Sequence, residues 1–100
     1  MDEVKRKWNY IPDDARATLT SDLTAELATL RAKEKLTQEE LANAIGISRQ
    51  TYSQIECGKI KMSWSTYLAI LFFYSTKEST AKLLEALGLY PNKYLKGNIE

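Results

Sequence analysis

Residues 37–58 constrain the fold of this 100-residue chain most strongly, because they encode two short helices joined by a tight turn at a glycine. Thr37 and Glu40 have the spacing of a capping box, which predicts that one helix begins directly after Thr37. Gly46 can adopt the left-handed conformation that ends this helix, and Ser48 can cap the next one. Two helices this close in sequence must cross at a steep angle, which predicts a helix-turn-helix.

This stretch resembles a known family, the phage-repressor or Xre-type helix-turn-helix proteins. The matching residues are Leu30-Arg31, Leu36-Thr37-Gln38-Glu39-Glu40-Leu41-Ala42, Ala44-Ile45-Gly46-Ile47-Ser48-Arg49, Ile55-Glu56 and Gly58-Lys59. The resemblance covers roughly residues 21–75 and is specific, because spacing, caps, glycines and apolar positions agree together. It implies a five-helix, lambda-repressor-like DNA-binding domain.

The chain is long enough for one domain and too short for a separate effector or catalytic module. Residues 1–20 have mixed charge and no clear period, which predicts an N-terminal arm. Residues 21–100 then form the helix-turn-helix domain, with a C-terminal helix and a short tail. The motif itself occupies residues 37–58.

The first helix of the domain is predicted from leucines that recur at helical spacing from Leu19 to Leu30. Ser21 is the better N-cap, so we expect this helix over about residues 22–34. A start as early as Asp13 remains open.

Two further helices follow the motif. Ser63 caps a helix over about residues 64–74, and Ser75 with Glu78 forms a second capping box that opens a helix ending at Leu87. Five helices and no strand pattern predict an all-α fold.

The helix at 64–74 is apolar on nearly all sides. One face carries Trp64, Leu68, Leu71 and Phe72, and another carries Tyr67, Ile70, Phe73 and Tyr74. Such a helix must be buried on both sides. One side faces the core, and the other is covered by the arm, by the last helix or by a second subunit. We favour a homodimer, since a monomer that reads one half-site rarely gains enough specificity.

Composition excludes several classes of protein. The chain has a net charge of +1, no histidine and one cysteine, which argues against a metal site, a disulfide framework and the commonest general base. No glycine-rich phosphate loop occurs, so we expect no enzyme activity and no cofactor. No apolar stretch is long enough to span a bilayer and no signal peptide is recognisable, so we expect a cytoplasmic protein without a membrane partner.

The second motif helix carries the candidate base-reading residues. Tyr52 and Ile55 face inward, so Arg49, Gln50 and Gln54 face outward, and the family makes its base contacts from these three positions. Arginine can bond O6 and N7 of guanine, and glutamine can bond N6 and N7 of adenine. Arg49 also stands at the positive end of a helix dipole, which is unfavourable unless an anion lies nearby.

The candidate phosphate contacts surround these residues. They are Gln38, Ser48, Ser53, Lys59 and Lys61. Gln38 and Ser48 stand at helix N-termini, where free N–H groups attract anions. In the family the residue that matches Gln38 also supports the first residue of the recognition helix, here Arg49.

Arg31 and Glu56 match a pair of family residues that form an ion pair between the first and third helices, so their role is structural support. Cys57 departs from the family pattern, because a thiol replaces a polar or basic residue and makes a poor phosphate ligand.

The resemblance implies a sequence-specific regulator of transcription that binds double-stranded DNA, typically a repressor. The alternative is an antitoxin-like adaptor that pairs with a toxin or another protein through Trp8, Tyr10, Tyr90 and Tyr94. A protein–protein module that has abandoned DNA is a third possibility.

Overall fold

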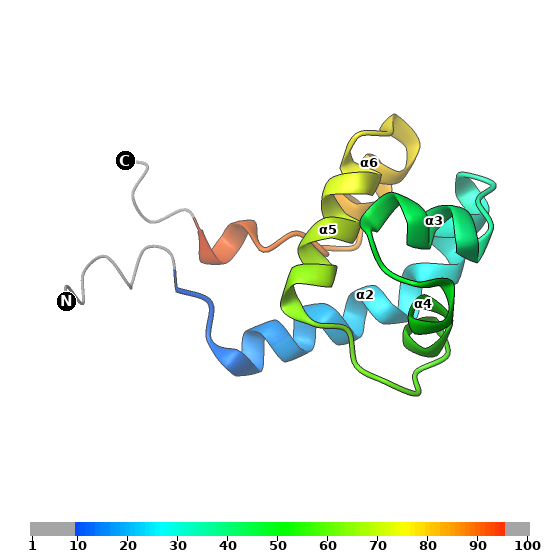
Figure 1. The fold of residues 1–100 in the computed structure, drawn as a ribbon. Helices are drawn as coiled ribbons and strands as arrows, with labels where there is room; N and C mark the ends of the chain where they lie inside the picture. The colour runs from blue at the N-terminus through cyan, green and yellow to red at the C-terminus, as the bar shows by residue number, and fades with distance from the viewer. Residues whose placement is uncertain (1–9, 96–100) are drawn as a thin grey trace.

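The computed structural model describes residues 10–95, which form five α-helices and one short 3-10 helix (Figure 1). In chain order these are α2 (Asp13–Lys33), α3 (Gln38–Ile45), α4 (Arg49–Glu56), α5 (Trp64–Ser75), α6 (Glu78–Ala86) and η1 (Asn92–Tyr94). No strand occurs between residues 10 and 95, so the all-α prediction is confirmed. Helix α2 lies along one side of the domain, with α3 and α4 near its C-terminal end (Figure 1).

Helix α2 is longer than predicted. It begins at Asp13, the earlier of the two starts that the sequence left open, so the favoured start near residue 22 was wrong and residues 13–20 of the expected arm are helical. Asp13 and Asp14 in the first turn suit the positive end of the helix dipole. Ser21 lies inside the helix and caps nothing. The extension stays helical because Leu19 is buried in the core.

The helix-turn-helix forms through its local signals. The capping box of α3 is complete, since the Glu40 amide donates to Thr37 Oγ1 at 3.0 Å and the Thr37 amide donates to Glu40 Oε1 at 2.9 Å. Gly46 ends α3 with a φ of 84°, a left-handed conformation that glycine adopts without strain. The predicted order of helix, glycine turn and helix is therefore confirmed.

The second predicted capping box is absent. Ser75 belongs to the last turn of α5, and its hydroxyl donates to the Phe72 carbonyl at 2.7 Å. Lys77 precedes α6 and provides no side-chain cap. The prediction was wrong because the serine hydroxyl bonds backward to its own helix, a competing interaction that the spacing alone does not reveal. Helix α6 ends at Ala86.

The core lies between α2, α5 and the motif helices. Its buried apolar residues are Ile11, Leu19, Leu23, Leu27, Leu30, Leu41, Ala42, Tyr52, Ile55, Met62, Tyr67, Ile70, Leu71, Tyr74, Leu84 and Leu89. Helix α5 contributes one face to this core, whereas its side chains Leu68 and Phe72 are exposed. The expectation that α5 is covered on both sides is therefore not met within residues 10–95.

Candidate nucleic-acid interface

Helix α4 has a buried side and an accessible side. Tyr52 is fully buried and Ile55 is only 2% exposed, so these two residues hold the helix against the core. Arg49 and Gln50 are exposed, and Gln54 is half-buried one turn after Gln50. The three candidate base-reading residues are thus accessible to an external partner.

Arg49 has no structural role that the described residues account for. It is the first residue of α4, and its side chain makes no hydrogen bond or ion pair with any residue between 10 and 95. A cation at a helix N-terminus costs about 0.3–1 kcal/mol. An unpaired arginine at this point is unfavourable for the isolated domain and favourable beside an anion.

Ser48 is fully engaged as a cap. Its Oγ accepts a hydrogen bond from the Thr51 amide at 3.0 Å and donates one to Thr51 Oγ1 at 2.9 Å. The amides of Arg49 and Gln50, in the same first turn, have no partner within the helix. A phosphate at this end would therefore meet backbone N–H groups, while the serine hydroxyl stays in the cap. Ser53 is half-buried one turn further along α4.

The segment after α4 presents two lysines. Gly58 has a φ of 84°, and the Lys59 amide donates to the Gln54 carbonyl at 2.9 Å, so the backbone closes the helix. The side chains of Lys59 and Lys61 are exposed and unpaired within residues 10–95. Cys57 is also exposed, with its thiol 3.6 Å from the Gln54 carbonyl. This segment can reach an anion with its lysine ammonium groups.

An ion pair joins α2 to α4 as the resemblance implies. Arg31 Nε and Nη2 donate to Glu56 Oε1 and Oε2 at 3.0 and 2.9 Å, and Arg31 Nη1 donates to the Leu36 carbonyl at 2.9 Å. The side chains are 22% and 13% exposed, respectively. The Arg31 guanidinium lowers the pKa of Glu56, and the Glu56 carboxylate raises the pKa of Arg31. This two-bond contact fixes the end of α4 relative to α2.

Two more side chains converge on Glu56. The Gln38 amide, at the start of α3, approaches the Glu56 carboxylate and helps to lower its pKa. Within residues 10–95 the Gln38 side chain is directed to Glu56 and forms no hydrogen bond with Arg49, so its expected support of Arg49 stays a prediction. Burial raises the pKa of Tyr52, and the nearby Glu56 carboxylate raises it further. The Tyr52 hydroxyl is buried without a well-formed hydrogen bond.

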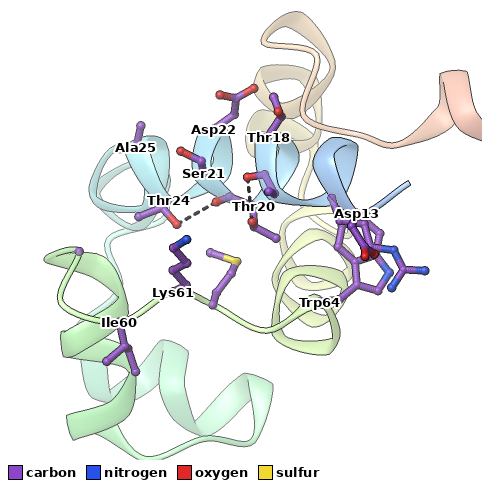
Figure 2. Close-up of a pocket in the computed structure, with 14 residues that line it drawn as sticks. Asp13, Thr18, Thr20, Ser21, Asp22, Thr24, Ala25, Ile60, Lys61 and Trp64 are labelled. Carbon is purple, nitrogen blue, oxygen red and sulfur yellow. Dashed lines mark hydrogen bonds between the residues drawn. The ribbon is translucent and has the colours of Figure 1, made fainter. Parts of the chain in front are cut away.

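An open groove separates α2 from the segment after α4 (Figure 2). Lys61 and Thr24 face each other across it (Figure 2). At its other end the Arg16 guanidinium lies 5.0 Å above the Trp64 ring, which stacks on Tyr67 with 4.4 Å between ring centroids. These contacts join the N-terminal extension of α2 to the start of α5. Sequence reasoning missed them, because no local pattern links positions so far apart.

Residues 10–95 contain neither a cluster of metal ligands nor a helix that could span a membrane. No group of three histidine, cysteine, aspartate or glutamate side chains is arranged to hold a metal ion. None of the described helices combines the length and the hydropathy needed to cross a membrane.

The fold and the accessible α4 define a small all-α domain built on a helix-turn-helix. A model of the helix-turn-helix domain family matches residues 22–84, and the chain belongs to this family. It is similar to an uncharacterized HTH-type transcriptional regulator of Methanocaldococcus jannaschii, MJ0272. The two are 42% identical over 52 residues, which cover 52% of this chain and 79% of the relative. No solved structure gives a significant match.

Proposed function

We propose that the chain is a sequence-specific regulator of transcription that binds double-stranded DNA, with α4 in the major groove. Membership of the helix-turn-helix family and the regulator name of the archaeal relative support this function. The Xre-type or phage-repressor subtype, and a repressing effect, rest on the resemblance of residues 21–75 described above.

One observation carries the proposal: the accessible side of α4 presents the side chains of Arg49, Gln50 and Gln54 without hydrogen-bond or ion-pair partners among residues 10–95, while its other side is fixed in the core. A rigid helix with free arginine and glutamine side chains suits the donor and acceptor pattern of major-groove base edges. A phosphate or a guanine edge that faces Arg49 would offset the unfavourable interaction between its positive charge and the helix dipole.

Phosphate contacts position this helix in the proposal. The free amides stand at the start of α4, and the exposed Lys59 and Lys61 follow its end. Gln38 stands at the N-terminus of α3, where a phosphate is also favoured. The overall charge of +1 is too small for affinity by charge alone, so placed contacts must supply the binding.

The proposed regulator acts as a homodimer on an inverted repeat. Its two copies of α4 would then read half-sites about one helical turn apart, roughly 34 Å. Pairing two half-sites supplies the specificity that one eight-residue helix lacks.

The test is a selection of bound duplexes from a random pool, followed by titration of the selected duplex by fluorescence anisotropy at physiological salt. We expect a symmetric consensus and an affinity at least about 1,000-fold above that for a scrambled duplex. Equal affinity for both duplexes would contradict sequence-specific regulation.

An antitoxin-like adaptor is the competing function. Tyr10 is 53% exposed and supports it, whereas Tyr90 and Tyr94 pack against the core. Trp8 lies outside the described residues. Co-purification of the chain with the product of a neighbouring, co-transcribed gene, together with absence of specific DNA binding, would favour the adaptor.

A further inference from the structure

The outer face of α5 is apolar but uncovered. Phe72 is 72% exposed and Leu68 is 44% exposed, while the opposite face of the same helix contributes Tyr67, Ile70 and Tyr74 to the core with no exposed surface. Large apolar side chains that lie one turn apart on one helix form a continuous patch. Such a patch on a small domain commonly marks an interaction surface.

The spacing of this face is that of a helix–helix seam. Ser65, Leu68, Phe72 and Ser75 are all exposed, and they follow one another at intervals of three, four and three residues. This alternation places side chains along the line of contact between two packed helices. The small serines at the ends allow a partner helix to approach closely. We call these four residues the α5 stripe.

The charge of α5 favours a second copy of the same chain as the partner. No residue of α5 between Trp64 and Ser75 is charged. In a two-fold interface, a side chain near the axis meets its own copy, so a charge there would face a like charge. The neutral α5 stripe meets this requirement.

The N-terminal segment of the same chain, residues 1–9, is a less suitable partner for the α5 stripe. Five of the nine residues in segment 1–9 are charged. Placing them against the α5 stripe would remove water from these charges without offering opposite charges on α5.

We propose that the α5 stripe is the self-association surface of this protein, through which two copies pair helix to helix. Self-association itself does not depend on the proposed function. Only its consequence does, namely that pairing brings two copies of α4 to one DNA duplex. The stripe begins at Ser65, which follows the exposed Lys61 by four residues in the chain.

The first experiment measures the association state by sedimentation equilibrium. We expect a wild-type dimer, and we expect Leu68→Lys to weaken its dissociation constant by about thirtyfold or more. Leu87→Lys is the matched control, because Leu87 is also 44% exposed but lies at the end of α6. A monomeric wild type, or equal effects of the two substitutions, would overturn the proposal.

Cross-linking identifies the surface independently of affinity. In a Cys57→Ser background, which removes the native thiol, Leu68→Cys should form an intermolecular disulfide under mild oxidation, and Leu87→Cys should not. Equal cross-linking at both positions would contradict the stripe. Deletion of residues 2–9 should leave the dimer intact; a dimer that requires those residues would assign the contact to them.

DNA binding separates this proposal from the proposed function. Leu68→Lys should lose at least about tenfold in affinity for a duplex with two half-sites, and should bind a single half-site as the wild type does. If Leu68→Lys abolished the dimer but kept the wild-type affinity for the two-site duplex, self-association would not contribute to DNA binding. Absence of specific binding by wild type and variant alike would instead refute the proposed function, while the sedimentation result would still decide the α5 stripe.

Discussion

On the inner side of α4, Tyr52 and Ile55 are buried and Glu56 pairs with Arg31, whereas on the outer side the side chains of Arg49 and Gln50 are exposed and form no hydrogen bond or ion pair with residues 10–95. The inner residues are buried or paired, so replacing them changes the free energy of unfolding. The outer residues contribute little to that free energy, so their replacement should change binding alone. Because different residues serve the two sides, α4 can be held rigidly by its inner side and still present an accessible outer side.

The largest effect is expected on the inner side. Glu56→Ala should lower the free energy of unfolding by about 2–4 kcal/mol, because it leaves the partly buried Arg31 guanidinium without its carboxylate. Urea denaturation measures the change. Glu39→Ala, at an exposed position in the first turn of α3, is the control and should stay within about 0.5 kcal/mol of wild type. Similar losses in both variants would show that the pair does not hold α4.

The second expected effect belongs to the outer side. Gln50→Ala should reduce discrimination at one base position by about 1–3 kcal/mol and leave the thermal unfolding midpoint unchanged, because the side chain is exposed and forms no hydrogen bond with residues 10–95. Anisotropy titrations against single-base variants of the selected duplex measure it. A variant that keeps its full base preference would contradict the assignment of Gln50.

A smaller effect follows from the lowered pKa of Glu56. The folded protein binds this proton more weakly than the unfolded chain, so the unfolded state takes up more protons as pH falls. The contribution of the ion pair is thus present above the ordinary glutamate pKa of 4.5 and is lost as pH falls through the lower folded value. Thermal midpoints of wild type and Glu56→Gln should converge across this range; parallel curves would contradict the pairing.

The smallest effect concerns Lys59. Lys59→Ala should weaken binding to all duplexes by a similar factor and flatten the salt dependence by about one unit, because one released counterion is lost. Anisotropy titrations at several salt concentrations measure the slope. A change confined to the selected duplex would indicate a base contact instead.

The sequence predicted those parts of the fold that local interactions determine. The capping box at Thr37 and Glu40 and the glycine at Gly46 involve neighbours in the chain, and both form as expected. The sequence left the start of α2 open between Asp13 and residue 22, because the extension is held by the burial of Leu19, which is a tertiary effect. The cap that the sequence predicted at Ser75 does not form, because the Ser75 hydroxyl donates instead to a second local partner, the Phe72 carbonyl.

For the candidate interface, too, the sequence predicted the features that depend on local spacing and not those that depend on packing between helices. The inward positions of Tyr52 and Ile55 followed from helical spacing, and the outward positions of the reading residues followed from them. The contact between Gln38 and Glu56 could not be read from spacing, because it depends on how α3 and α4 cross. The stacking of Arg16 on Trp64 likewise requires the packed fold.

The most direct test of the central claim is a nuclear magnetic resonance titration of the labelled protein with its selected duplex. We expect the side-chain amide resonances of Gln50 and Gln54, and the backbone amides at the start of α4, to shift most strongly and to saturate at one α4 per half-site. Unchanged resonances in α4, with the largest shifts instead near Tyr10 and Leu95, would contradict this claim.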